Sequence, residues 1–137
     1  MIIKCIPVPA SFSCTAQNSD HGIELKSETG LLASYNYPLP VDDSVVCTWY
    51  ILVNTDLRIR LSFDFFNLSQ ANDCSEDYVK VLDGNSTHSN QLGRYCGEEK
   101  PPTITSTTSN LYVIFRSSRN AKYPGFKASY KTEDSSK

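Results

Sequence analysis

The chain has 137 residues, of which 39% are hydrophobic and 20% charged, so it is long enough to bury the core of one soluble domain. Its formal net charge of −2 excludes a strong positive field over the whole surface, and with it nonspecific attraction to nucleic acid or an anionic membrane. No apolar run in the sequence approaches the roughly 18 residues that a membrane-spanning helix requires, so we expect no membrane insertion.

Runs rich in β-branched and aromatic residues recur along the chain and favour strands, because such side chains suit a pleated, half-buried surface. No window of helical length keeps a 3.6-residue period. Residues 1–13 show no period and contain two prolines, so we expect a loose N-terminal arm. The expected strands are, in chain order, 23–26, 30–38 (ending in a proline-containing turn), 48–53, 57–65, 78–82 with a short return at 92–97, 111–115, and 126–130.

The clearest period-two pattern covers residues 57–65, where five apolar residues alternate with polar or charged ones, namely Arg58, Arg60, Ser62 and Asp64. This alternation predicts a strand with one buried face, to which Phe65 would belong, and one face in water. Residues 111–115 alternate in the same way, but Tyr112 and Ile114 make the second face partly apolar as well.

Two cysteines bracket a predicted hairpin in the middle of the chain. Residues 78–82 favour a strand, Asp83-Gly84 is a strong turn dipeptide, and the segment 92–97 returns. Because Cys74 precedes this unit and Cys96 lies near its end, one cross-link could close the hairpin. Many short strands separated by turn signals favour an antiparallel β-sandwich for the chain as a whole.

The chain contains five cysteines, at positions 5, 14, 47, 74 and 96. None forms a Cys-x-x-Cys pair, and neither histidine lies at zinc-ligand spacing from two of them, which argues against a zinc site. Their wide, irregular spacing is typical of structural disulfides in an oxidising compartment. Four cysteines allow three pairings, and the spacing alone does not choose among them.

Two glycosylation sequons, Asn67-Leu68-Ser69 and Asn85-Ser86-Thr87, indicate the same compartment. Asn85 lies in a predicted polar loop that has room for a glycan, whereas Asn67 follows the end of a predicted strand. We therefore expect a secreted or extracellular glycoprotein that is modified at Asn67 and Asn85, and more fully at Asn85.

Seven short motifs follow one another from about Cys14 to Tyr130. They are Gly30-x-x-x-Ser34-x-Asn36-Tyr37-Pro38, Cys47-x-Trp49-x-Ile51, the alternating segment 61–68, Cys74-x-x-Asp77-Tyr78-Val79-x-Val81-x-Asp83-Gly84, Tyr95-Cys96-Gly97, Val113-x-Phe115-x-Ser117 and Gly125-Phe126. In this order they resemble the CUB domain, an extracellular module of complement proteases, tolloid-type proteases, neuropilins and spermadhesins. Tyr35 stands where that family usually has proline. The resemblance implies an all-β, antiparallel jelly-roll sandwich at 14–130, with an arm at 1–13 and a polar tail at 131–137.

The resemblance also implies how the cysteines pair. The CUB family joins its first cysteine to the second and its third to the fourth, which gives Cys14–Cys47 and Cys74–Cys96 here. The gap from Cys14 to Gly30 is several residues longer than is usual in the family. Cys5 has no counterpart, so it could pair with a neighbouring domain, pair between chains, or be free.

Many CUB domains hold one calcium ion, and the resemblance locates the corresponding residues. Asp77 matches one of the family's acidic ligands, but Ser69 and Ser118 occupy the other two acidic positions. Calcium takes six to eight oxygen ligands, often including several carboxylates, so one carboxylate makes a poor cage. We expect no metal or other cofactor, and expect Asp77 to brace a loop by accepting backbone N–H bonds. The alternative is a calcium site in which Glu76 or Asp73 substitutes.

Six basic residues could form a surface patch for a sulfated glycan or an acidic partner if the fold brought them together, or else lie on ordinary solvated faces: Arg58, Arg60, Arg116, Arg119, Lys122 and Lys127. The sequence contains no glycine-rich phosphate loop, metalloprotease motif or recognisable catalytic triad, so no catalytic residues are expected. The expected function is that of a non-catalytic CUB module that binds an extracellular protein, within a larger secreted or cell-surface protein. The alternative is a lone secreted, spermadhesin-like chain that binds glycans through its basic residues.

Overall fold

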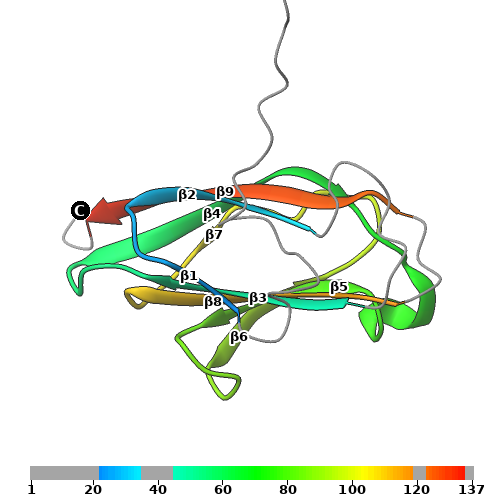
Figure 1. Cartoon of the computed structure of the whole chain (residues 1–137), viewed down its shortest axis with the longest axis horizontal. Coiled ribbons are helices and arrows are strands. Elements are labelled where there is room, and N and C mark those ends of the chain that lie inside the picture. Colours follow the sequence, from blue (N-terminus) through cyan, green and yellow to red (C-terminus); the bar gives the residue numbers. More distant parts are fainter. Residues whose placement is uncertain (1–21, 35–44, 119–122, 135–137) are drawn as a thin grey trace, which may run out of the picture.

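Two β-sheets lie face to face in the computed structural model, which describes residues 22–34, 45–118 and 123–134 (Figure 1). Within these residues, no helix is long and apolar enough to cross a membrane. The elements are β1 (Ile23–Leu25), β2 (Thr29–Ala33), β3 (Val45–Leu52), β4 (Leu57–Asn67), the 3-10 helix η1 (Ala71–Cys74), β5 (Tyr78–Asp83), β6 (Asn90–Tyr95), β7 (Ile104–Thr105), β8 (Asn110–Ser117) and β9 (Gly125–Asp134).

One sheet has five strands in the order β1-β3-β8-β5-β6, and the other has four in the order β2-β9-β4-β7. Every pairing is antiparallel except that of β1 with β3, which is parallel. Strands that are distant in sequence, such as β3 and β8, therefore lie side by side. The arrangement confirms the predicted antiparallel sandwich.

Strand β4 shows how the alternating sequence builds one layer of the core. Ile59, Leu61 and Phe63 are buried between the sheets. A register shift in the pairing with β9 then places two consecutive residues outward, so Phe65 is 36% exposed and Phe66 is buried. The expectation that Phe65 lies on the buried face was therefore wrong, because the bulge ends the simple alternation before that residue.

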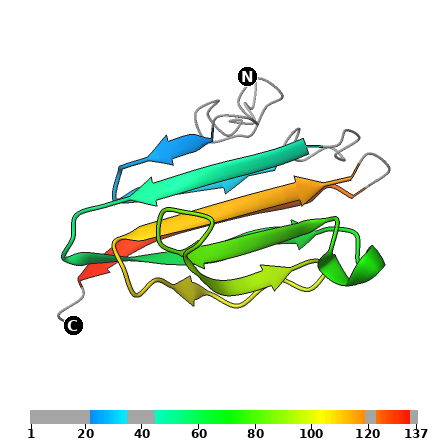
Figure 2. The same cartoon turned by 90° about the horizontal axis from the view of Figure 1, so that it is seen from below.

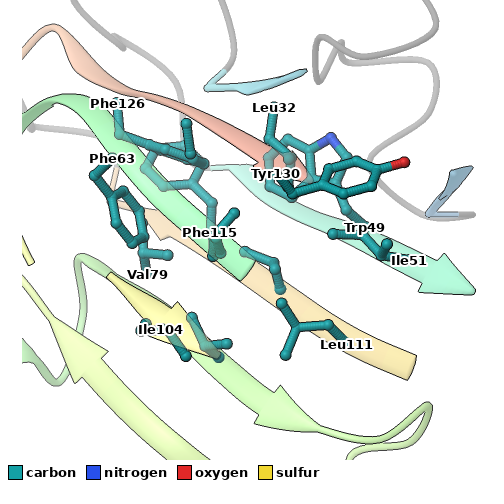
Figure 3. Close-up of a cluster of buried hydrophobic side chains, with 14 of the residues drawn as sticks. Leu32, Trp49, Ile51, Phe63, Val79, Ile104, Leu111, Phe115, Phe126 and Tyr130 are labelled. Carbon is teal, nitrogen blue, oxygen red and sulfur yellow. The ribbon is translucent and has the colours of Figure 1, made fainter. Parts of the chain in front are cut away.

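The ring of Phe126, on β9, is the aromatic centre of the core (Figure 3). Its centroid lies 5.6 Å from that of Trp49 on β3, 5.4 Å from that of Phe115 on β8 and 6.0 Å from that of Phe63 on β4. These separations are typical of favourable aromatic pairs. Because β3 and β8 belong to the opposite sheet, Phe126 links the two layers.

The backbone of Phe126 is fixed by Ser34, a buried residue that directly follows β2. The Phe126 N–H donates to Ser34 Oγ at 3.1 Å, and the Ser34 N–H donates to the Phe126 carbonyl at 3.0 Å. Neither N–H is left unpaired in the core, where an unpaired donor would be costly. The serine of the first motif thus extends the β2–β9 ladder by one step.

The predicted strands exist, with ends that differ by a few residues. The polar tail expected from Lys131 was a partial error, because β9 continues through Asp134 and pairs with the start of β4. This pairing uses backbone groups and needs no apolar side chain, so the side-chain pattern gave no signal. Neither η1 nor β7 was expected. The predicted arm at 1–13, residues 135–137 of the tail and the turn after Ser34 lie outside the described residues.

We predict that Ser34→Ala lowers the free energy of unfolding by about 1–3 kcal/mol, because it leaves the buried Phe126 N–H without an acceptor. Urea denaturation followed by Trp49 fluorescence measures this change. The matched control is Ser62→Ala, whose half-buried hydroxyl lies 3.4 Å from Thr103 Oγ1 and should contribute about 0.5 kcal/mol or less. Equal losses in the two variants would contradict the role assigned to Ser34.

Candidate functional site

At one end of the sandwich, the carboxylate of Asp77 joins two neighbouring strands. The start of β5 lies beside the end of β8, because the two strands pair antiparallel. Asp77 directly precedes β5, and Ser118 directly follows β8. The Asp77 side chain is 3% exposed; its Oδ1 accepts the Ser118 N–H at 2.6 Å, and its Oδ2 accepts the Ser118 hydroxyl at 3.1 Å. As expected, Asp77 accepts a backbone N–H bond and braces a loop.

The described oxygen donors do not fit a calcium cage. Both Asp77 oxygens already accept hydrogen bonds from Ser118, so the neutral residue at the second acidic position acts as a donor. Ser69 is half-buried between β4 and η1, and Asp73 and Glu76 are exposed. Among the described residues, no group of three His, Cys, Asp or Glu side chains could hold a metal ion. A single buried carboxylate falls short of what calcium prefers.

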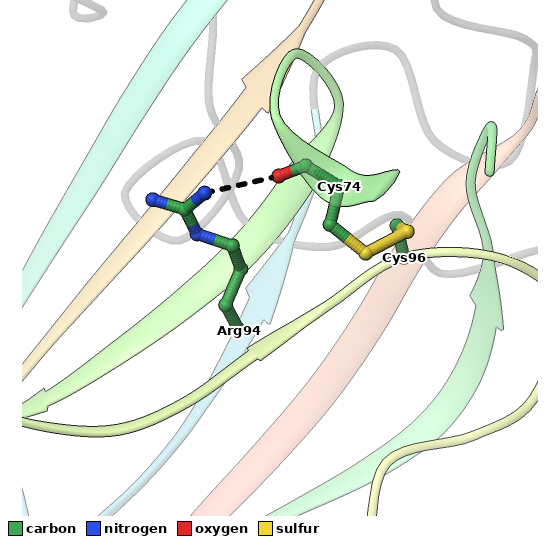
Figure 4. The surroundings of a disulfide bond; sticks show 3 residues. All are labelled: Cys74, Arg94 and Cys96. Atoms are coloured by element: carbon green, nitrogen blue, oxygen red, sulfur yellow. Dashed lines mark hydrogen bonds between the residues drawn. A yellow bond between two sulfur atoms is a disulfide. The ribbon is translucent and has the colours of Figure 1, made fainter. Parts of the chain in front are cut away.

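The predicted Cys74–Cys96 disulfide is present and joins η1 to the segment after β6, with 5.4 Å between the two Cα atoms (Figure 4). Arg94, two residues before Cys96, donates a hydrogen bond to the Cys74 carbonyl at 3.3 Å. Cys47 is also disulfide-bonded. Its predicted partner, Cys14, lies outside the described residues, as does Cys5, so the Cys14–Cys47 pairing stays a prediction.

The disulfide borders an open cleft of about 420 Å³. Charges of both signs line it, so it does not select for one sign of ligand charge. The lining residues are Gln70, Asp73, Cys74, Arg94, Tyr95, Cys96, Glu99, Lys100, Pro101 and Pro102. Asp73 and Cys74 both have left-handed backbone angles, with φ of 54° and 63°, which costs energy for residues other than glycine. The disulfide and the Arg94 hydrogen bond hold this turn in place.

The four described members of the predicted basic patch do not all lie on one sheet. Arg58 and Arg60 lie on β4 and Lys127 on β9, in the four-stranded sheet, whereas Arg116 lies on β8 in the other sheet. The last two predicted members, Arg119 and Lys122, are outside the described residues. A single patch of all the described members is therefore wrong, because β8 belongs to a different sheet from β4 and β9.

A second apolar cluster lies on the outer face of the five-stranded sheet. The apolar residues on both faces of the predicted strand at 111–115 indicated such a cluster. It consists of Leu82, Tyr112 and Ile114, with Tyr50 and Tyr78 packed against it. The Tyr50 and Tyr112 ring centroids lie 4.5 Å apart, and the Tyr50 hydroxyl donates to that of Tyr112 at 3.2 Å. Burial, with this hydrogen bond, raises the pKa of Tyr112 to about 12, so its hydroxyl stays neutral at physiological pH.

His88 is the one histidine in the described part of the chain, and it is exposed in the loop between β5 and β6. Its backbone N–H donates to Ser86 Oγ at 3.2 Å. This position belongs to a local turn at the surface.

The two sequons differ in exposure. Asn85 is exposed in the loop between β5 and β6. Asn67 is the last residue of β4, paired with Gly125, and its side-chain Oδ1 is buried without a hydrogen-bond partner among the described residues. An oligosaccharyltransferase therefore reaches Asn85 more easily once the strands have paired.

The comparisons with known proteins agree with this geometry. The family model of the CUB domain matches residues 21–130. The chain belongs to the CUB family. This CUB domain is 38% identical to dog cubilin over 113 residues, which is 82% of this chain and 3% of that protein. It is 33% identical to Xenopus laevis bone morphogenetic protein 1 over 109 residues, which is 80% of this chain and 15% of that protein.

Solved structures give the same result. The rat MASP-1 CUB1-EGF-CUB2 domains match with a TM-score of 0.74 and 30% identity, over 83% of this chain and 43% of that one. The MASP-1 CUB2 domain bound to Ca²⁺ matches with a TM-score of 0.71 and 28% identity, over 79% of this chain and 96% of that one. The full extracellular region of zebrafish Gpr126/Adgrg6 matches with a TM-score of 0.72 and 28% identity, over 82% of this chain and 15% of that one. The chain thus spans only a small part of the cubilin and bone morphogenetic protein 1 sequences that it matches.

We predict that material secreted from mammalian cells carries a glycan on Asn85 at higher occupancy than on Asn67, because Asn67 is held in the β4–β9 ladder with its amide oxygen buried. Glycopeptide mass spectrometry measures the two occupancies. Asn85→Gln should remove most of the glycan mass, and the matched Asn67→Gln should remove less. Full occupancy at Asn67 with an unmodified Asn85 would contradict this prediction.

Proposed function

We propose that this CUB domain is a non-catalytic extracellular module that binds another protein, as one part of a larger secreted or cell-surface protein. The observation that carries the proposal is the share of its relatives that it covers, which is 3% of dog cubilin and 15% of the Xenopus protein. A fold that recurs as a small part of such long chains serves them as a module. The match to the extracellular region of Gpr126 supports the location.

The distribution of polar groups supports binding rather than catalysis. The inner faces of both sheets are filled by the hydrophobic core, which leaves loops and outer sheet faces to meet a partner. Several hydroxyl and carboxyl groups near the strand ends are already committed to internal hydrogen bonds, as Asp77 and Ser118 show. A rigid scaffold with its strand ends braced is suited to present a fixed surface.

We further propose that this domain folds and binds without calcium, although a related domain has been solved with the ion bound. The Asp77–Ser118 contact supports this proposal, since it joins directly two segments whose counterparts in ion-binding family members carry acidic residues. An ion that does not bind the folded state adds nothing to its stability by mass action.

The melting temperature is therefore predicted to be the same in millimolar calcium and in excess chelator. Asp77→Ala should lower the free energy of unfolding by about 1–3 kcal/mol in both conditions alike, because the Ser118 N–H loses its acceptor. The control Ser118→Ala removes only the hydroxyl bond and should cost less. A calcium-dependent rise in melting temperature that Asp77→Ala abolishes would show instead that Glu76, Asp73 or backbone oxygens complete a cage.

Protein binding is tested with the secreted chain, biotinylated and displayed on streptavidin, against an array of purified ectodomains with and without chelator. We predict a saturable interaction with at least one ectodomain, competed by unlabelled chain and unchanged by chelator or by added heparin. The reduced and alkylated chain is the control for a folded binding surface. The proposal fails if no ectodomain binds, if heparin removes all binding, or if the purified chain cleaves or modifies a partner.

A further inference from the structure

The outer face of the five-stranded sheet carries three cations in two adjacent cross-strand rows; Figure 2 views this face. One row pairs Lys80 of β5 with Arg94 of β6, and the next pairs Tyr78 of β5 with Arg116 of β8. Paired residues share a face, and the intervening Val79 points into the core, so these four side chains point outward. They are called the cationic cluster below.

Tyr78 is the centre of the cationic cluster. The Arg94 guanidinium carbon lies 4.7 Å from the centroid of the Tyr78 ring, and the Lys80 ammonium lies 5.9 Å from it. Both distances fall within the roughly 6 Å at which a ring attracts a cation. Arg94 is further fixed by its hydrogen bond to the Cys74 carbonyl. One ring and one carbonyl thus hold two positive charges close together on an exposed face.

No described acid is in direct ion-pair contact with the cationic cluster, although Arg94 also lines the cleft that contains Asp73 and Glu99. No ion pair joins any of its three cations to another described residue. No acid occupies either row, since the seven positions are Val46, Arg116 and Tyr78 in one and Thr48, Ile114, Lys80 and Arg94 in the other. Like charges directly opposite each other destabilise a sheet, so an anionic ligand would relieve a cost that the free domain bears.

The burial on this face favours a ligand that binds through charge. Leu82, Tyr112 and Ile114 are only 2%, 6% and 8% exposed and are packed against Tyr50. Val46, at 46% exposed, is the one large apolar side chain among the seven row positions that remains open. A protein hot spot or a lipid bilayer would therefore gain little apolar burial here. A polyanion needs none, because its affinity comes from the cations.

We propose that the cationic cluster binds a sulfated glycan chain that lies across β8, β5 and β6. Adjacent strands are about 4.8 Å apart, so cations on three neighbouring strands span about 10 Å and can meet successive anionic groups of one linear chain. Sulfated glycans are polyanions with little apolar surface, and they occur outside the cell, where this module is proposed to act. The proposal rests on the proposed extracellular location but not on the binding of a protein, so either proposal can fail alone.

The other sheet offers an internal comparison. Arg60 on β4 stands directly opposite Lys131 on β9, and both are exposed, so this pair has the same composition and register as Lys80 with Arg94. Its surroundings differ, because the next outward position of β9 is Glu133, which is exposed. The Arg60–Lys131 pair therefore carries the same charge as the Lys80–Arg94 pair, but it has an acid in a neighbouring cross-strand row, which the two rows of the cluster do not have.

The test titrates a heparin octasaccharide into the full chain by isothermal calorimetry at about 0.1 M salt. Lys80→Gln with Arg94→Gln should weaken binding about tenfold, the loss expected for two exposed ion pairs in the upper part of their usual range. The matched control, Arg60→Gln with Lys131→Gln, removes the same charges from the other sheet and should change the dissociation constant less than about twofold, since screened charges on the opposite sheet contribute little at this salt. Charge-conserving Lys80→Arg with Arg94→Lys should retain most of the affinity.

The outcomes separate the proposal from its competitors. The Gln variant loses the Arg94 hydrogen bond to Cys74 as well as a like-charge pair, so its melting temperature is measured first. We expect it to stay well above the temperature of the titration, so weaker binding will not reflect unfolding. The proposal is overturned if the octasaccharide does not bind, if both double variants lose affinity equally, or if desulfated heparin binds as well as heparin. Preferential binding of polyglutamate, or of phosphatidylserine vesicles, at the same residues would also overturn it, and would assign the cluster to an acidic protein or a membrane.

Discussion

The position of Phe126 is the constraint on which the rest of this sandwich depends. Its ring contacts aromatic rings from β3, β4 and β8, and its backbone is paired with Ser34 at the end of β2. A shift of β9 by one residue would turn this ring out of the core and every neighbouring side chain with it. Because the two hydrogen bonds to Ser34 oppose that shift, one buried serine helps to set the register between β2 and β9 and so keeps the Phe126 ring in the core.

A second constraint operates along β5, which has an aspartate at each end. Asp77, before the strand, holds the residue that follows β8, and Asp83, its last residue, accepts the backbone N–H and hydroxyl groups of Thr107 and Thr108 shortly before β8 begins. Both ends of β8 are thus tied to β5 by carboxylates. Asp83 serves this purpose through Thr107 and Thr108, and Asp77 through Ser118.

The sequence predicted the parts of this structure that depend on side-chain periodicity. The strand at 57–65, the hairpin between Cys74 and Cys96 and the bracing role of Asp77 all followed from patterns or from the family motifs. Features that depend on backbone hydrogen bonding produce no comparable pattern in the sequence. The bulge that exposes Phe65 and the extension of β9 to Asp134 arise from hydrogen-bond registers, which a sequence read one residue at a time does not contain.

Surface clusters of charge could not be predicted from the sequence for a different reason, because they depend on the order of the strands in each sheet. Arg58, Arg60 and Arg116 have similar local patterns, and only the assignment of β4 and β8 to opposite sheets separates them. The same strand order brings together Lys80 and Arg94, which lie 14 positions apart and were not singled out from the sequence. A net charge of −2 therefore conceals a local group of three cations.

Arg94 connects the structural and the proposed binding roles of the β5–β6 hairpin. It lies two residues before Cys96, its hydrogen-bond acceptor is the carbonyl of Cys74, and its guanidinium rests on the ring of Tyr78. The disulfide fixes the distance between that carbonyl and β6, so it also fixes where Arg94 can hold its charge. A cation held in advance loses less conformational entropy when an anion binds than a freely rotating one does. The cross-link would therefore contribute to binding as well as to stability, although neither cysteine would touch the ligand.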